Sequence, residues 1–212
     1  MKPMSKVWRR ARLSAFKLVR DRRGVAAIEF AMIVPIMLML FFGTVEFSSG
    51  VAVDRKVTLI ARTLSDVTSQ STSVADTDLA NFFTSACAIM YPYAGPPPCT
   101  TANNPTKAVI SELYVDPSTL KARVQWSKAY QGGVALTVGT TVSAVPGALL
   151  IGGTYLIYSQ VSYLYTPAVN YANMMPSAGI TLTDVSYTRP RQSQCVIYPT
   201  PSPGVTVPCP TS

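Results

Sequence analysis

The residues of this chain that could do chemistry are few, and the first is a carboxylate in an apolar setting. Residues 25–45 read VAAIEFAMIVPIMLMLFFGTV, an apolar run of 21 residues in which Glu29 is the one charged side chain. As a helix this run is about 31 Å long, close to the thickness of the hydrocarbon core of a bilayer. A carboxylate at the centre of such a core costs about 2.5–3.5 kcal/mol on insertion scales, and less near an end. Glu29 therefore either pairs with a positive charge or lies at the membrane boundary and reaches water.

The four cysteines form two closely spaced pairs that suit disulfides better than a metal site. Cys87 and Cys99 lie twelve residues apart, Cys195 and Cys209 lie fourteen apart, and each pair encloses a proline-rich stretch. Of the three possible pairings we favour these local ones, because each bridge would close an irregular loop and contribute about 3 kcal/mol. The two crossed pairings stay open. Zinc would need all four thiolates at irregular spacing, because the chain has no histidine, so we expect no metal site.

The sequence contains no residue set that is typical of an enzyme. The absence of histidine excludes Ser-His-Asp and Cys-His arrangements, and no glycine-rich phosphate loop of the Walker type is present. Asp76 and Asp78 are interpreted as capping residues of a helix, and Glu112 and Asp116 as ordinary charges at strand ends. The tyrosines clustered at 155–171 are interpreted as sheet packing rather than as a carbohydrate-binding surface. We expect no enzymatic activity and no cofactor.

The residues around Glu29 resemble a known processing signal. Gly24 is followed by Val25-Ala26-Ala27-Ile28-Glu29 and preceded by a basic leader, an arrangement that resembles the type IV prepilin processing site. The longer segment RRGVAAIEFAMIVPIMLMLFFGTVEF is similar to the N-terminal segment of TadE-like pseudopilins, in the Flp (Tad) branch of the type IV pilin-like proteins. Phe30 departs from the tyrosine that is usual there in the small major pilins.

The resemblance implies a processed subunit of a pilus machinery. A prepilin peptidase would cut between Gly24 and Val25, and Glu29 would then neutralise the new N-terminal amine of a neighbouring subunit. The expected partners are the prepilin peptidase, other pilin-like subunits, the Tad assembly platform and the lipid of the inner membrane. The length of the chain favours a minor pseudopilin or accessory subunit of a Flp (Tad) pilus assembly or secretion system. The alternative is an uncleaved single-pass protein that anchors a binding or structural domain in the periplasm.

The net charge of +8 predicts topology rather than nucleic-acid binding. Residues 1–24 hold nine Lys or Arg and one acid, whereas residues 25–212 hold nine of each sign. Basic residues beside an apolar span stay in the cytoplasm, so the C-terminal domain is expected in the periplasm of a bacterial cell. A secretory signal peptide is disfavoured, because its apolar region is usually about 7–15 residues long.

These residues are expected to lie on four segments with an α+β fold. Residues 1–24 are the cytoplasmic leader, 25–45 the transmembrane segment and 46–69 an amphipathic continuation of one helix. Its predicted buried stripe comprises Val53, Val57, Ile60, Leu64 and Val67, at spacings of three and four. Residues 70–212 form the extracytoplasmic domain with its disulfide-closed loops. Within it we expect a helix near 77–90 and antiparallel strands near 108–115, 120–127, 134–142, 154–166 and 179–191.

Overall fold

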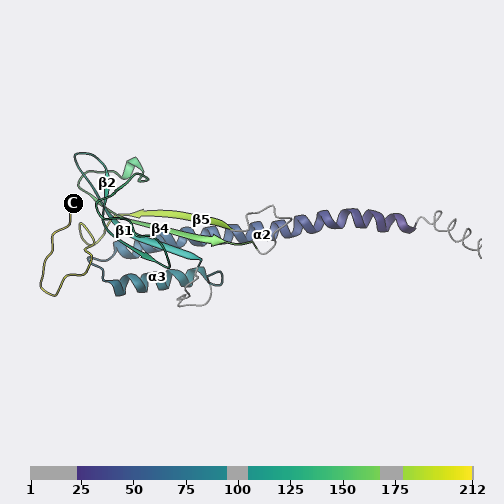
Figure 1. Cartoon of the computed structure of the whole chain (residues 1–212), viewed down its shortest axis with the longest axis horizontal. Helices are drawn as coiled ribbons and strands as arrows, with labels where there is room; N and C mark the ends of the chain where they lie inside the picture. Colours follow the sequence, from purple (N-terminus) through teal and green to yellow (C-terminus); the bar gives the residue numbers. More distant parts are fainter. Residues whose placement is uncertain (1–22, 95–104, 168–178, 212) are drawn as a thin grey trace, which may run out of the picture. The chain divides into compact units, whose positions relative to one another are not determined.

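The computed structural model of the chain has the α+β fold expected from the sequence, a long helix followed by a small antiparallel sheet (Figure 1). It describes residues 23–94, 105–167 and 179–211. Contacts between residues divide the chain into two compact units, Met1–Phe47, here unit 1, and Ser48–Ser212, here unit 2.

The long helix α2 spans Arg23–Ser69, which confirms the single helix expected over 25–69. Its part in unit 1 is apolar and exposed, and in the described part of the chain it is the one helix long and apolar enough to cross a membrane. Its part in unit 2 carries the predicted stripe. Four members of the stripe (Val53, Val57, Ile60 and Leu64) are fully buried, and the last, Val67, is half-buried.

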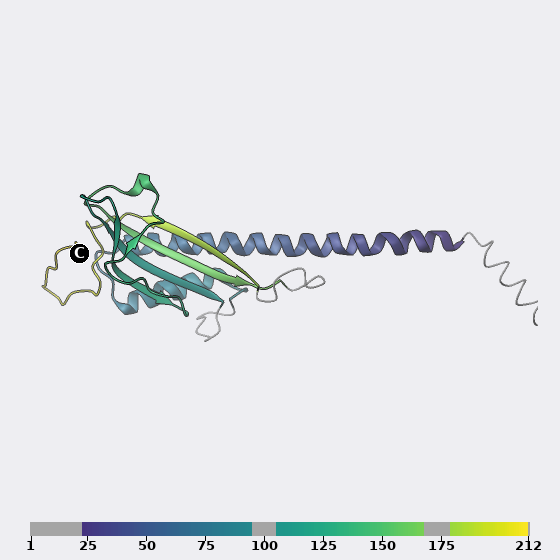
Figure 2. The same cartoon turned by 45° about the horizontal axis from the view of Figure 1, so that its top comes forward.

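The core of unit 2 forms where α2 and a second helix cover one face of the sheet (Figure 2). This helix, α3, spans Asp76–Met90 and buries Leu79, Phe83 and Met90 against the same cluster as the α2 stripe. Of the two acids expected to cap α3, Asp78 does so and Asp76 does not. Ala75 precedes the helix, and its backbone N–H donates to the Asp78 carboxylate at 2.8 Å. Asp78 therefore caps α3, whereas Asp76 is free to bind other side chains.

The sheet has five antiparallel strands in the order β3-β2-β1-β4-β5. Its strands span Thr106–Val115 (β1), Ala122–Tyr130 (β2), Thr141–Val142 (β3), Tyr155–Tyr165 (β4) and Ile180–Thr188 (β5), and a 3-10 turn, η1, spans Gly147–Leu149. Three of the expected strands agree closely with β1, β4 and β5. The segment 134–142 contributes only the two residues of β3, because Gly139 and Thr140 bond to Val124 at a turn and the residues before them form no strand.

A β-bulge in β2 changes which side chains of the strand expected at 120–127 face the helices. Trp126 pairs with Glu112, but the next residue of β1, Leu113, pairs with Val124, so Gln125 is the extra residue. An extra residue turns all later side chains to the other face of the sheet. Trp126 accordingly packs with the helices, whereas Ala122 and Val124 pack with Leu113 in a second cluster on the opposite face. The apolar residues of β2 are therefore divided between the two faces of the sheet.

The hairpin between β1 and β2 is wider than the four-residue type I turn that Asp116-Pro117-Ser118-Thr119 favours. The N–H of Leu120 donates to the carbonyl of Asp116 at 2.8 Å, which closes a five-residue turn. Leu120 has a φ of 52° and is exposed, so the strand begins at Ala122 rather than at Leu120. The Asp116 carboxylate accepts hydrogen bonds from Ser118 and Thr119. An Asp at the start of a type I turn makes bonds of the same kind, which is why the sequence favours the shorter turn.

The packing of α2 predicts a sharp contrast between two neighbouring residues. Ile60→Ala should lower the free energy of unfolding of unit 2 by about 2–5 kcal/mol, because it leaves a cavity where Ile60 is 1% exposed. Leu59→Ala is the matched control, because Leu59 is 51% exposed on the same helix, and its effect should stay within about 0.5 kcal/mol. Denaturant unfolding of the detergent-solubilised chain measures both. Equal effects of the two variants would contradict this packing.

Candidate functional site

The residues of the expected processing signal lie at the N-terminal end of α2. Gly24 and Val25 stand in its first turn, and Glu29 lies one turn after Val25. A Cβ added to Gly24 would meet no atom within 4 Å, so packing of the described residues does not require glycine there.

Glu29 and Phe30 are both directed away from the chain. Phe30 is 69% exposed, and Glu29 is also exposed. Across residues 23–94, 105–167 and 179–211, Glu29 forms no ion pair. The structure therefore leaves both side chains free to contact something outside unit 1, and it does not bring either of them to another residue of the expected site.

The exposed apolar surface of unit 1 is continuous from residue 25 to residue 42. It comprises Val25, Ile28, Phe30, Met32, Ile33, Ile36, Met37, Leu38, Met39, Leu40, Phe41 and Phe42, each more than a third exposed. Soluble monomers rarely expose an apolar patch of this extent, because water does not stabilise it. This unit is compatible with a single-pass anchor in a membrane.

The C-terminal cysteines are joined in the structure as a local pair. Cys195 is bonded to Cys209, with the two Cα atoms 5.8 Å apart, and the bridge closes the proline-rich tail. Cys87 is a buried residue of α3, and no cysteine among the described residues is free. The pairing of Cys87 with Cys99 stays a prediction, because Cys99 lies outside the described residues.

Glu112 is a buried carboxylate, and its interpretation as a strand-end charge is wrong. It is 0% exposed in the middle of β1. Its Oε1 accepts the backbone N–H of Val196 at 2.5 Å, and its Oε2 lies 3.1 Å from Nε1 of Trp126. The Trp126 N–H also donates to the Val196 carbonyl at 2.7 Å. Glu112 and Trp126 together hold the chain segment next to Cys195 against the sheet.

Burial determines the charge state of Glu112. Removal of the carboxylate from water raises its pKa from an ordinary 4.5 to about 8, although the hydrogen bonds from Val196 and Trp126 lower it. The carboxyl group is therefore neutral at neutral pH. The alternation of side chains along β1 could have indicated that Glu112 is buried. Ala108, Ile110 and Glu112 share one face of the strand, and the first two are core residues.

Other polar groups of unit 2 stabilise the fold rather than form a reactive cluster. Asp76 binds Lys128 at 3.0 Å and accepts the Tyr198 hydroxyl at 2.8 Å, and the Lys128 ammonium lies 4.8 Å from the Tyr198 ring centre. Arg191 forms an ion pair with Asp66. In the described ranges, no group of three or more acidic, cysteine or histidine side chains could hold a metal ion.

The tyrosines of β4 are packing residues, as interpreted from the sequence. Tyr155, Tyr158 and Tyr163 are buried, and their hydroxyl groups donate within the unit to Pro210, Gln160 and Tyr93 respectively. The individual donor-to-acceptor distances are 2.8, 2.9 and 3.1 Å. These rings therefore present no open stacking surface to a sugar.

Comparison with known proteins finds one match, over the N-terminal part of the chain. Residues 24–64 match the TadE-like protein family, which confirms the resemblance drawn from the sequence. The match begins at Gly24 and covers the exposed apolar part of α2 together with most of its buried stripe. No curated protein and no solved structure matches the chain. The match associates the chain with Tad pili in general terms.

The raised pKa of Glu112 predicts that stability falls as pH rises. Between about pH 4.5 and 8 the folded chain holds a proton that the unfolded chain has lost, so the free energy of unfolding decreases with pH across this window. At about 1.4 kcal/mol per pKa unit, the total decrease should be of the order of 5 kcal/mol. Glu112→Gln, a neutral mimic of the protonated acid, should remove most of this slope. Denaturant unfolding at several pH values measures it.

Asp116→Asn is the matched control for this experiment. Hydrogen bonds, chiefly from the Ser118 hydroxyl, lower the pKa of Asp116 to about 2, so its titration lies below the window. The control should keep the slope between about pH 4.5 and 8. A slope that persists unchanged in Glu112→Gln would show that another group is responsible.

Proposed function

We propose that this chain is a minor pseudopilin, an accessory subunit of a Flp (Tad) pilus assembly or secretion system, and not an enzyme. The observation that carries the proposal is the match to the TadE-like family over residues 24–64, which begins at the glycine of the expected processing site. The exposed apolar side chains of unit 1 support it, because a helix of this kind needs lipid or other apolar helices around it.

In this proposal the basic leader directs insertion and is then removed. Residues 1–24 stay on the cytoplasmic side of the bacterial inner membrane, and unit 2 lies in the periplasm, where disulfides such as Cys195–Cys209 form. A prepilin peptidase cleaves the bond between Gly24 and Val25. This bond lies in the first described turn of α2.

Glu29 then acts in assembly rather than in catalysis. Cleavage creates an α-amino group on Val25, and an amine and a carboxylate in hydrocarbon each cost less when they pair. Glu29 is exposed on its own helix, so its carboxylate is available to the Val25 amine of a neighbouring pilin-like subunit. Phe30, exposed beside it, would pack against the same neighbour. The remaining partners are the Tad assembly platform and the inner-membrane lipid, and no nucleic acid is involved.

The processing step is tested by adding one methyl group at two glycines of α2. Gly24→Ala should block cleavage by the peptidase, because a side chain there would obstruct its site, and the product should keep residues 1–24. Gly43→Ala is the matched control, because a Cβ at either glycine meets no atom within 4 Å. The mass of the chain after co-expression with a prepilin peptidase reports both. An unprocessed N-terminus in the natural chain and the control would instead support the uncleaved membrane anchor.

The pairing role of Glu29 is tested by removing its charge. Glu29→Ala and Glu29→Gln should insert in the membrane as the natural chain does, yet reduce pilus assembly or secretion by at least about tenfold, which is the effect of losing about 1.4 kcal/mol. Glu29→Asp, which keeps the charge, should retain part of the activity. Normal assembly by Glu29→Ala, in cells with no other working copy, would show that the pairing idea is wrong.

A further inference from the structure

One end of unit 2 carries exposed aromatic and apolar side chains. Tyr91 is 54% exposed and Tyr93 36%, both just after the end of α3, and Ile180 is 40% exposed at the start of β5. These three side chains lie at the same end of unit 2, because α3 and β4 end there and β5 begins there. Tyr165, the last residue of β4, pairs with Ile180, and the hydroxyl of Tyr163 donates to the Tyr93 carbonyl at 3.1 Å.

Lys56 of α2 binds the backbone at this end of unit 2. The Lys56 ammonium donates to the carbonyls of Ile89 and Tyr91 at 3.0 and 2.6 Å, and it lies 5.3 Å from the centre of the Tyr93 ring. A Cβ added to Gly50 would lie 3.9 Å from the Tyr165 ring, so an earlier turn of α2 reaches the same end. The backbone of the two tyrosines is thus held, while their rings remain exposed.

Few residues of the chain separate this end of unit 2 from the apolar segment. Gly50 follows Val45, the last residue of the apolar run, by five residues, which span at most about 18 Å even when fully extended. The headgroup layer on each side of a bilayer is about 5–7 Å thick. Tyrosine is enriched in that layer, because its ring is apolar and its hydroxyl remains hydrated.

We propose that the end of unit 2 formed by Tyr91, Tyr93 and Ile180 rests in the lipid headgroup layer of the membrane that holds the apolar segment. The proposal rests on the membrane insertion that the proposed function requires. The contact would hold unit 2 against the membrane surface in addition to the covalent link through α2.

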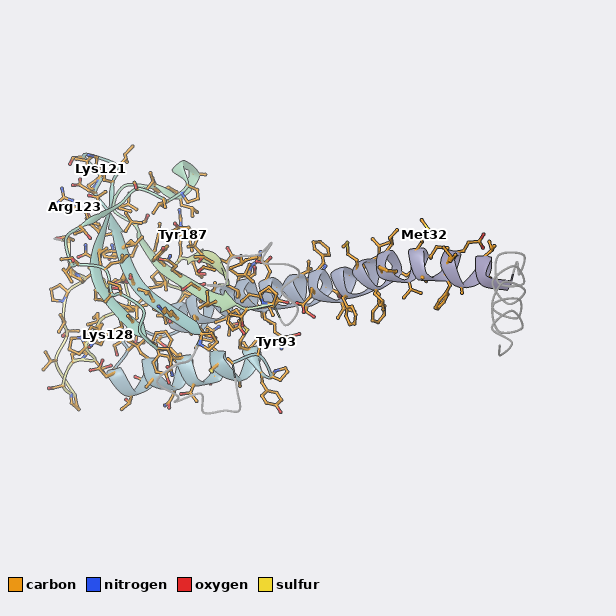
Figure 3. All side chains as sticks on the ribbon, turned by 45° about the vertical axis from the view of Figure 1, so that its right-hand side comes forward. Met32, Tyr93, Lys121, Arg123, Lys128 and Tyr187 are labelled. Carbon is orange, nitrogen blue, oxygen red and sulfur yellow. A yellow bond between two sulfur atoms is a disulfide. The ribbon has the colours of Figure 1, made fainter. Side chains whose placement is uncertain are left out.

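The opposite end of unit 2 offers an internal reference. The hairpin that contains Leu120 joins β1 and β2 at the far end of β1, about 30 Å from Thr106 at a rise of about 3.4 Å per residue. Figure 3 shows Tyr93 and the hairpin residue Lys121 at opposite ends of the unit. Leu120 is 51% exposed and Tyr93 36%, so a probe placed at either position has access to solvent.

The test uses the full chain in phosphatidylcholine vesicles that contain lipid with a nitroxide on the headgroup, which quenches nearby tryptophan. Three single variants are compared: Tyr93→Trp, Leu120→Trp as the matched control, and Phe42→Trp in the apolar segment, which is measured with nitroxide on the acyl chain. The natural chain, whose own Trp8 and Trp126 fluoresce in every variant, supplies the background signal that is subtracted. We expect quenching of Tyr93→Trp by headgroup nitroxide to exceed that of Leu120→Trp at least twofold, and strong quenching of Phe42→Trp by acyl-chain nitroxide.

Each other outcome overturns a defined part of the account. Equal quenching of Tyr93→Trp and Leu120→Trp, with Phe42→Trp quenched, would leave the anchor intact and refute the surface contact. A blue-shifted but unquenched Tyr93→Trp would identify a protein, such as a second copy of this chain, as the occupant and would also refute it. An unquenched Phe42→Trp would refute membrane insertion, and with it both the contact and the proposed function.

Discussion

The apolar side chains of residues 25–42 must be kept away from water, and this constraint determines how the rest of the chain is arranged. Twelve large apolar side chains in this part of α2 are exposed, and no described residue of unit 1 buries them. A bilayer core, or a bundle of similar helices within one, provides the apolar surroundings that they need. A carboxylate in this setting is costly, which is why Glu29 is the side chain for which a charged partner is most needed.

After residue 47 the same helix packs within unit 2, and the spacing of its apolar residues changes accordingly. Apolar residues then recur at helical spacing, and they are buried by α3 and one face of the sheet. The bulge at Gln125 allows the sheet to serve two clusters, because it turns Trp126 toward the helices and Val124 toward the opposite face. Trp126 and Glu112 then hold the C-terminal segment, which the Cys195–Cys209 bridge closes.

Features with a strong period or a local signal were predictable from the sequence. The extent of α2, its stripe through Val57 and Ile60, and the strands β4 and β5 all follow from apolar spacing. The bulge was not predictable, because one extra residue in a strand leaves the alternating pattern of Ala122, Val124 and Trp126 unchanged in the sequence. The burial of Glu112 depends on Val196, which is 84 residues away in the chain, and no local pattern identifies such a partner. Of the candidate site, residue types and spacing supplied Gly24 and Glu29 as candidates and the pair Cys195–Cys209, whereas the hydrogen-bond partners of Glu112 emerged only from the folded sheet.

The central claim is that the apolar segment holds this chain in a membrane, and extraction of the protein from its native cells tests it most directly. Membranes are washed first with high salt and then with alkaline carbonate, which remove peripheral proteins, and finally with a mild detergent. We predict that the protein stays with the membranes through both washes and is released only by the detergent. Its release by salt or carbonate, or its presence in the soluble fraction, would contradict the account.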